Sequence, residues 1–226
     1  MNSQLTHMAD DSRHLQLDPA PSLWDRAGAR MYDPVLWLGE LRGMRARRAR
    51  LLGEARGEVL EIGAGTGLNL AHYPAGIESL TLTEPVAGMA AQLKGRVERS
   101  GRTAHVVEAP AEQLPFADDS FDTVVSTLVL CTVEDVPRAL MEIQRVLRPG
   151  GRLLFVEHLR SDSERWGRWQ DRLKRPWAAF GAGCRCNQRT LAAIEASGLR
   201  LEGVQRERWR GMPAVVRPLA VGRARG

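Results

Sequence analysis

The chain has 226 residues with a formal net charge of +5, and 43% of its residues are hydrophobic. This length fits one large domain, or one domain with an added N-terminal piece, and the apolar content is sufficient for a sizeable core. Three cysteines are too few for a disulfide framework and fit a reducing cytoplasm, where we expect the protein to reside. No run approaches the ~18 uninterrupted apolar residues that a membrane span requires, so we expect none.

The first part of the chain is predicted to be separate from the main domain. Residues 1–21 are polar, resemble no signal peptide and are expected to form a disordered lead. Apolar residues at near-helical spacing in residues 22–56 predict a helical lid, which Pro34 should divide into two helices. Residues 57–226 are expected to form the main domain.

The main domain alternates apolar strands with helices. The predicted strands are 58–63, 79–84, 103–109, 121–130, 152–158, 199–209 and 213–222. The predicted helices are 67–74, 86–100, 136–147 and 191–198. Apolar runs without alternation are typical of strands covered on both faces. The pattern therefore predicts an α/β fold with a doubly wound, mostly parallel, seven-stranded sheet.

An insert of about residues 159–190 interrupts this alternation. It is rich in Trp and Arg and contains no clear strand. Elements placed between the fifth strand and the last helix can lie over the edge of the sheet, so the insert is predicted to shape a substrate site.

The first strand runs into a glycine-rich turn, Val59–Leu70, with the sequence VLEIGAGTGLNL. Such turns let backbone N–H groups approach an anionic or adenosine-bearing ligand. A dinucleotide fingerprint would need glycine at position 68, where this chain has Leu68. An acid, Glu84, ends the next strand, where a carboxylate can accept hydrogen bonds from both ribose hydroxyls of either type of cofactor.

Four segments resemble successive motifs of the class I S-adenosylmethionine-dependent methyltransferases. These are VLEIGAGTGLNL, LTEP, AEQLPFADDSFDTVVSTLVLCTV and EIQRVLRPGGRLLFVEH, which lie between Val59 and His158. The later segments WGRWQDRLKRPW and GAGCRCNQRT are similar to a narrower group, the methyltransferase-like 7 or alkyl thiol methyltransferases. The resemblance implies a Rossmann-like fold and S-adenosyl-L-methionine as the cofactor.

The resemblance also implies a set of cofactor-binding residues. They are Glu61, Gly63, Ala64, Gly65, Gly67, Glu84, Pro85, Ala111, Glu112 and Leu128. Glu61 and the glycine turn would border the methionine part, and Glu84 would bind the ribose. Pro85 would flank the adenine, Ala111 and Glu112 would approach its edge, and Leu128 would lie near the sulfonium. Where many relatives carry Asp for the adenine amino group, this chain has Pro110, so backbone groups or Glu112 would have to replace that Asp.

Methyl transfer from a sulfonium needs alignment and exclusion of water more than covalent chemistry. A thiol acceptor needs little help from a base, because a few per cent is already thiolate at neutral pH. Other acceptors would need more, and His158, at the end of the fifth strand, is the candidate catalytic base. A packed histidine that hydrogen-bonds a carbonyl is the alternative.

Aromatic residues of the lid and the insert are candidates for enclosing an apolar acceptor. Tyr32, Trp37 and Trp169 are predicted to bind substrate, or else to pack helices onto the sheet, and Cys184 is a candidate pocket residue. Cys184 and Cys186 alone make a poor zinc site, so no metal is expected. Cys131 is assigned to the core.

The expected partner is a small-molecule acceptor. The leading hypothesis is S-methylation of a fairly apolar thiol, and the alternative is C- or O-methylation of a quinone- or polyketide-like acceptor. Methylation of a lipid or a nucleic acid is a further alternative. The arginine-rich run 42–50 has no interleaved aromatic residues, so no nucleic acid is expected, although peripheral membrane contact stays open. Both a monomer and a homodimer are compatible with the sequence.

Overall fold

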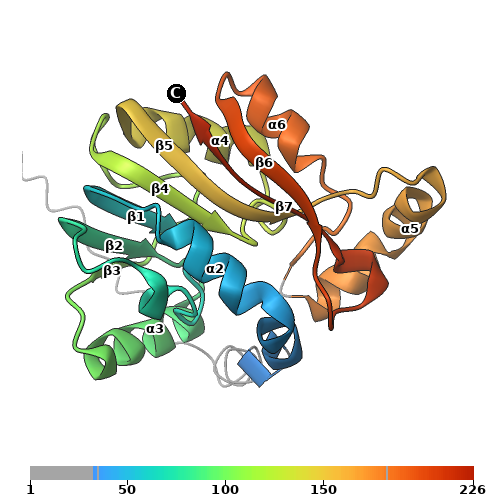
Figure 1. Ribbon diagram of the computed structural model, residues 1–226, viewed down its shortest axis with the longest axis horizontal. Coiled ribbons are helices and arrows are strands. Elements are labelled where there is room, and N and C mark those ends of the chain that lie inside the picture. The colour runs from blue at the N-terminus through green and yellow to red at the C-terminus, as the bar shows by residue number, and fades with distance from the viewer. Residues whose placement is uncertain (1–32, 35, 182) are drawn as a thin grey trace, which may run out of the picture.

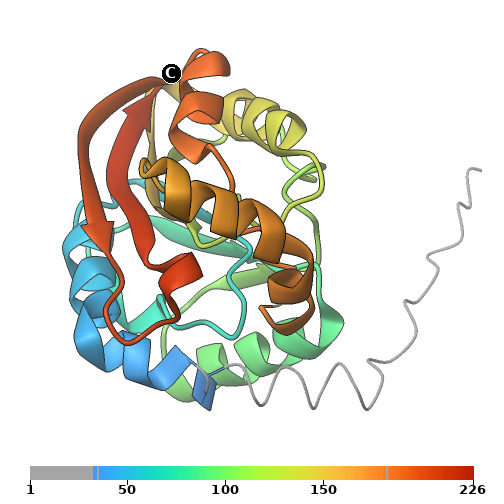
Figure 2. The same cartoon turned by 90° about the vertical axis from the view of Figure 1, so that its right-hand side faces the viewer.

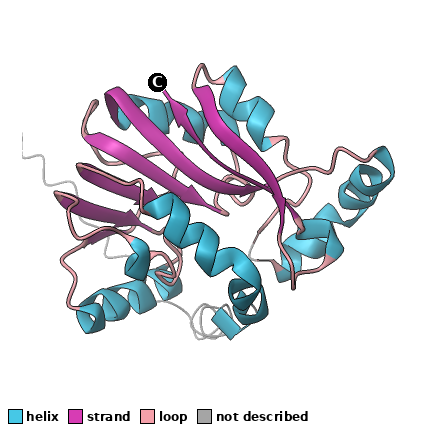
Figure 3. Cartoon of the chain, viewed as in Figure 1, coloured by secondary structure: helices cyan, strands magenta, loops and turns pink. Residues whose placement is uncertain are grey.

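The computed structural model describes residues 33–34, 36–181 and 183–226, and a seven-stranded sheet lies at its centre (Figures 1 and 3). The strands are β1 Glu58–Ile62, β2 Ser79–Thr83, β3 His105–Val107, β4 Phe121–Thr127, β5 Leu147–His158, β6 Arg200–Arg208 and β7 Pro218–Arg225. Their order in the sheet is β3-β2-β1-β4-β5-β7-β6. The first five strands are parallel, and β7 runs antiparallel to both β5 and β6. The predicted doubly wound, mostly parallel sheet is confirmed.

Helices cover both faces of the sheet (Figure 2). The longer helices are α2 Arg45–Leu52, α3 Ala87–Ser100, α4 Val136–Val146, α5 Glu164–Phe180 and α6 Thr190–Ala196. Three short helical turns are η1 Glu40–Met44, η2 Leu70–His72 and η3 Ala214–Val216. Buried side chains of α2 and α3 pack in one apolar cluster, whereas those of α4 and α6 pack in another.

Successive side chains of β5 pack alternately in the two apolar clusters. Leu153 and Phe155 pack with α4 and α6, whereas Leu154 and Val156 pack with α2 and α3. All four side chains are fully buried. Since successive side chains of a strand point to opposite faces, a strand covered by helices on both sides must be apolar throughout.

The helix predicted at residues 67–74 is wrong, because only the three-residue turn η2 forms there. The glycine turn continues as far as Gly67, whose φ is +87°, and Pro74 follows seven residues later. Too few residues remain between them for an α-helix.

The predicted break at Pro34 stays a prediction, because residues 1–32 and residue 35 lie outside those that the structure describes. Asp33 and Pro34 are helical, and the described break lies at Arg42 and Gly43, where φ reaches +116° at the glycine. A positive φ interrupts a helix, which accounts for the break at Gly43. The predicted lead and the lid up to residue 32 lie outside the described residues.

The insert contains α5, which continues past Pro176 and lies beside η3 at one end of the sheet. Gln170 fixes this helix from its buried face. Its Nε2 lies 3.1, 2.9 and 2.8 Å from the carbonyl oxygens of Leu159, Cys186 and Val215. No helix in the described part of the chain is both long and apolar enough to cross a lipid bilayer.

Candidate active site

A cleft of about 580 Å³ opens where β1, β2 and β4 end. Ligands of open parallel sheets bind beyond these carboxyl ends. The cleft is lined by Gly63, Gly65, Glu84, Pro85, Val86, Met89, Pro110, Ala111, Glu112, Gln113, Thr127, Leu128, Val129, Thr132, Val133, Glu134, Asp135 and Arg138. Seven of the ten predicted cofactor residues line it, whereas Glu61, Ala64 and Gly67 are not among its lining residues.

The glycine turn brings backbone to the cleft. A Cβ on Gly65 would meet no atom within 4 Å, so this position faces open space, whereas a Cβ on Gly67 would lie 2.7 Å from Leu93. The N–H of Ala64 donates to the carbonyl of Thr83 at 2.8 Å and joins the turn to β2. The turn therefore presents unhindered main chain to a ligand at Gly65 and packs tightly on α3 at Gly67.

Glu84 is one of the residues that line the cleft. Its Oε2 accepts a hydrogen bond from the N–H of Gly65 at 2.8 Å, and its Oε1 accepts one from Val86 at 2.9 Å. Burial raises the pKa of this carboxyl, and these two backbone bonds oppose the shift. The carboxylate is thus fixed in orientation with its remaining lone pairs available at the cleft.

Glu61 supports the turn from behind and is 3% exposed. Its carboxylate accepts hydrogen bonds from Asn69 Nδ2 at 2.7 Å and from the Tyr73 hydroxyl at 2.6 Å. Arg48 in turn donates to Asn69 Oδ1 at 2.7 Å. Burial raises the pKa of Glu61 to about 7, although both hydrogen bonds lower it.

The loop after β4 is held in an unusual backbone conformation. Leu128 has a φ of +62°, and its N–H donates to the carbonyl of Val156 at 2.8 Å. Glu157 Oε1 accepts hydrogen bonds from Ser126 Oγ at 2.7 Å and from the N–H of Val129 at 3.0 Å. Sequence reasoning missed Glu157, although an acid in the apolar run 152–158 was a usable signal.

Glu112 and Pro110 both line the cleft. The Glu112 carboxylate accepts a hydrogen bond from the N–H of Glu134 at 2.7 Å, and Arg138 Nε donates to the Glu112 carbonyl at 3.0 Å. Glu112 therefore also fixes the loop that leads into α4.

His158 is 4% exposed and is not among the residues that line the cleft. Its ring stacks on Trp209 with a centroid distance of 5.7 Å. Burial lowers its pKa to about 4, and the backbone groups of Pro218 and Val216 oppose this shift. The imidazole is therefore neutral at neutral pH.

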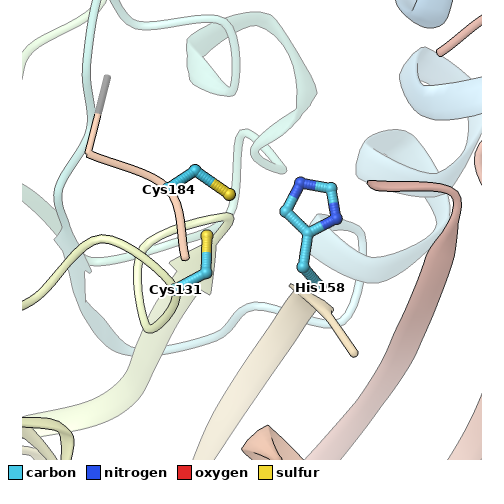
Figure 4. Close-up of side chains that lie close together, drawn as sticks. All are labelled: Cys131, His158 and Cys184. Atoms are coloured by element: carbon cyan, nitrogen blue, oxygen red, sulfur yellow. The ribbon is translucent and has the colours of Figure 1, made fainter. Parts of the chain in front are cut away.

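Two cysteines lie beside this histidine. Cys131, Cys184 and His158 offer ligand atoms that are all within 4.8 Å of one another, and Figure 4 shows the two sulfur atoms and the imidazole converging. Cys131 is fully buried, as the sequence analysis expected. Sequence reasoning paired Cys184 with Cys186, but the structure pairs it with Cys131, which is 53 positions away in the chain.

Of the predicted aromatic substrate residues, the two that the structure describes do not line the cleft. Trp37 is 62% exposed and Trp169 is 47% exposed, and Tyr32 lies outside the described residues. Asp33 does reach the glycine turn, since its Oδ1 accepts from Thr66 Oγ1 at 2.6 Å.

Within the arginine-rich run, side chains form ion pairs. Arg47 and Arg50 pair with Glu207, and Arg48 pairs with Glu40. Another hollow of about 910 Å³ is lined by arginines of this run and of residues 206–217, and it contains no residue of β1, β2 or β4.

Comparisons with known proteins agree with the fold and the cleft. A family model described as a methyltransferase domain matches residues 60–155. The human thiol S-methyltransferase TMT1B is 34% identical over 193 residues, which is 80% of this chain and 77% of that protein. The demethylmenaquinone methyltransferase of Thermobifida fusca is 35% identical over 156 residues, or 66% of this chain and 65% of that protein.

Solved structures show the same fold. A methyltransferase from Thermotoga maritima, titled a possible histamine N-methyltransferase, superposes with a TM-score of 0.63 at 22% identity, over 88% of this chain and 96% of that one. The fold and the glycine-rich cleft define a Rossmann-like enzyme that binds a nucleoside cofactor. The chain belongs to the class I S-adenosylmethionine-dependent methyltransferases, close to the TMT1 group. It is an enzyme, and S-adenosylmethionine is its cofactor.

Proposed function

We propose that this methyltransferase transfers the methyl group to the sulfur of a small, fairly apolar thiol. The proposal is supported mainly by the sequence similarity to human TMT1B, which extends over 80% of the chain. The second human relative, TMT1A, is 35% identical over 154 residues and is also named a thiol S-methyltransferase.

The cleft supports a small cofactor and an uncharged acceptor. In this proposal Glu84 binds the ribose hydroxyls, the turn at Gly63 and Gly65 borders the methionine part, and Pro85 flanks the adenine. Ala111 and Glu112 approach the adenine edge, and Leu128 lies near the sulfonium. Apolar atoms of Leu128, Val129 and Val133 contribute to the wall that the acceptor would share.

A thiol acceptor also fits the ionisable groups of the cleft. Glu84 and Glu112 each accept backbone hydrogen bonds, and Asp135 accepts one from the N–H of Arg138 at the start of α4. All three carboxylates therefore already accept structural hydrogen bonds from the backbone. A thiol reacts as its thiolate, which is already present at a few per cent at neutral pH, so alignment and exclusion of water would supply most of the rate.

The test is turnover with labelled S-adenosylmethionine and matched acceptors of one carbon skeleton that end in a thiol, an amine or a phenol. Methyl transfer to the thiol alone is expected, with a KM that falls as the alkyl chain lengthens. A reduced naphthoquinone serves as a further acceptor, because the menaquinone methyltransferase is 35% identical. Methylation of that quinol on carbon, without turnover of any thiol, would replace this proposal by the second candidate function.

A further inference from the structure

Three segments that are distant in sequence bring two thiols and an imidazole together behind the cleft. Cys131 follows β4, His158 ends β5, and Cys184 follows α5. All three residues are buried, and their ligand atoms lie within 4.8 Å of one another (Figure 4). The reaction proposed above uses none of these contacts.

We infer that Cys131, His158 and Cys184 form a three-ligand site for a thiophilic divalent cation, Zn²⁺ in the first place. Zinc takes Cys and His ligands at about 2.3 and 2.0 Å in a tetrahedron, so two sulfurs and one nitrogen lie about 3.5–3.8 Å apart. The observed limit of 4.8 Å exceeds this by about 1 Å, which small side-chain rotations can remove.

The surroundings hold each ligand in place. The carbonyl of Cys131 accepts a hydrogen bond from the N–H of Arg185 at 2.7 Å, which fixes the two cysteine loops against each other. Thr190 Oγ1 donates to the carbonyl of His158 at 2.9 Å, and the imidazole stacks on Trp209. A site held by its supporting shell needs little reorganisation to bind a metal.

The orientation of the imidazole is a second observation at this cluster. In Figure 4 the ring turns Nε2 toward the two sulfur atoms and Nδ1 away from them. Nε2 is therefore the ring nitrogen that would bind the metal together with the two thiolates.

The donor set determines the kind of site. Two thiolates and one imidazole favour zinc over magnesium or calcium, which prefer oxygen ligands. Three protein ligands leave a fourth position, as in catalytic rather than structural zinc sites. In this assignment His158 is a metal ligand and does not act as a general base. The assignment differs from the sequence analysis, which expected no metal.

The site borders the cleft through the segment that carries Cys131. Leu128, Val129, Thr132 and Val133, on either side of this cysteine, line the cleft. If the proposed thiol methylation holds, on which this step rests, an acceptor thiol in the fourth position would be bound as its thiolate. The metal would lower the pKa of the thiol, so that its proton passes to water without a protein base. The thiolate sulfur would then form a bond to the methyl carbon as the bond from that carbon to the sulfonium sulfur breaks, and the demethylated cofactor would leave as a neutral thioether.

Cobalt titration of the reduced full-length protein tests the site without any turnover. Co²⁺ reports thiolate ligands through a charge-transfer band, and Zn²⁺ should abolish that band by displacement. We expect one Co²⁺ per chain. Cys131→Ser and Cys184→Ser should each weaken binding about tenfold or more, and His158→Asn should change the visible spectrum.

Cys186→Ser is the matched control. Cys186 is fully buried, but its sulfur lies 3.9 Å from the carbonyl of Gln170 and is not part of the cluster. Its variant should bind Co²⁺ as the parent does, and circular dichroism checks that each variant folds. Absence of the band in the parent would overturn the site, as would its loss in Cys186→Ser, which would indicate the Cys184–Cys186 pair instead.

A small alkanethiol added to the cobalt-loaded protein tests the fourth position. A shift of the charge-transfer band is expected. An unchanged spectrum would overturn the link to the acceptor. Methylation of thiols by a protein that binds no Co²⁺ would overturn the metal site alone, so the two proposals fail separately.

Discussion

The N–H of Gly65 donates a hydrogen bond to Oε2 of Glu84 at 2.8 Å, which joins the turn after β1 to the end of β2. One carboxylate thus fixes the turn and also faces the cleft. The same group is proposed to bind the ribose, so turn geometry and cofactor affinity should depend on it together.

Replacing Glu84 by Gln should weaken binding of S-adenosylmethionine by about 10- to 100-fold. Hydrogen bonds to charged groups contribute about 1.5–3 kcal/mol, and 1.4 kcal/mol corresponds to a factor of ten. Isothermal titration calorimetry with the demethylated cofactor measures the change. Glu78→Gln, at an exposed position just before β2, is the control and should bind normally. Equal affinities of both variants would remove Glu84 from the binding site.

Alanine at two glycines of the turn should separate binding from stability. Both residues have a positive φ, +59° at Gly65 and +87° at Gly67, so each substitution should cost about 1–2 kcal/mol in backbone strain. A Cβ at Gly65 would enter the open cleft, whereas one at Gly67 would collide with Leu93. Gly65→Ala should therefore lower cofactor affinity about tenfold or more, and Gly67→Ala should lose about 1–3 kcal/mol more stability.

Calorimetric titration and urea unfolding of both variants check this contrast. If Gly65→Ala binds the cofactor as tightly as the parent, the ligand does not approach this face of the turn.

The buried Glu61 should make stability depend on pH. Its pKa is about 7 in the folded protein and near 4.5 when unfolded, so the folded state holds the proton more tightly. The free energy of unfolding should therefore fall as pH rises from about 4.5 to 7, by on the order of 3 kcal/mol. Glu61→Gln keeps a neutral group there and should remove this part of the decline.

Urea unfolding of both proteins between pH 4.5 and 8 measures the effect, with the difference between them as the observable. Glu157, whose pKa burial also raises to about 7, contributes equally to both and cancels. A difference that stays constant over this range would show that Glu61 does not titrate in the folded state.

Gln170 should be far more important for stability than its neighbour Trp169. Its Nε2 faces three main-chain carbonyls, and its Oε1 accepts from the N–H of Ser161 at 2.7 Å. Gln170→Ala leaves several of these buried groups without a partner and should cost about 3 kcal/mol or more, since each such group costs about 1–3 kcal/mol. Trp169→Ala at an exposed site should change the free energy of unfolding by less than about 0.5 kcal/mol.

Denaturant melts of both variants give these values. A large loss in Trp169→Ala would mean that its indole packs against a part of the protein that the structure does not describe.

The sequence alone determined the sheet and the position of the cleft. Apolar runs such as 121–130 predict strands covered on both faces, and the glycine pattern after Val59 together with Glu84 locates the cleft. These features are local, because a strand, a turn and the acid that follows them depend on neighbouring residues. The same local reasoning failed at residues 67–74, where the conformation of the turn overrode helical spacing.

Only the tertiary structure decided which distant side chains meet. Cys131 and Cys184 come together because the loops after β4 and α5 pack on one end of the sheet, and no spacing in the sequence encodes that contact. Burial also depends on the tertiary structure, and it raises the pKa of Glu61 and of Glu157 to about 7. Strand and turn propensities depend on each residue and its neighbours in the sequence. Contacts between remote segments arise only when the apolar faces pack together.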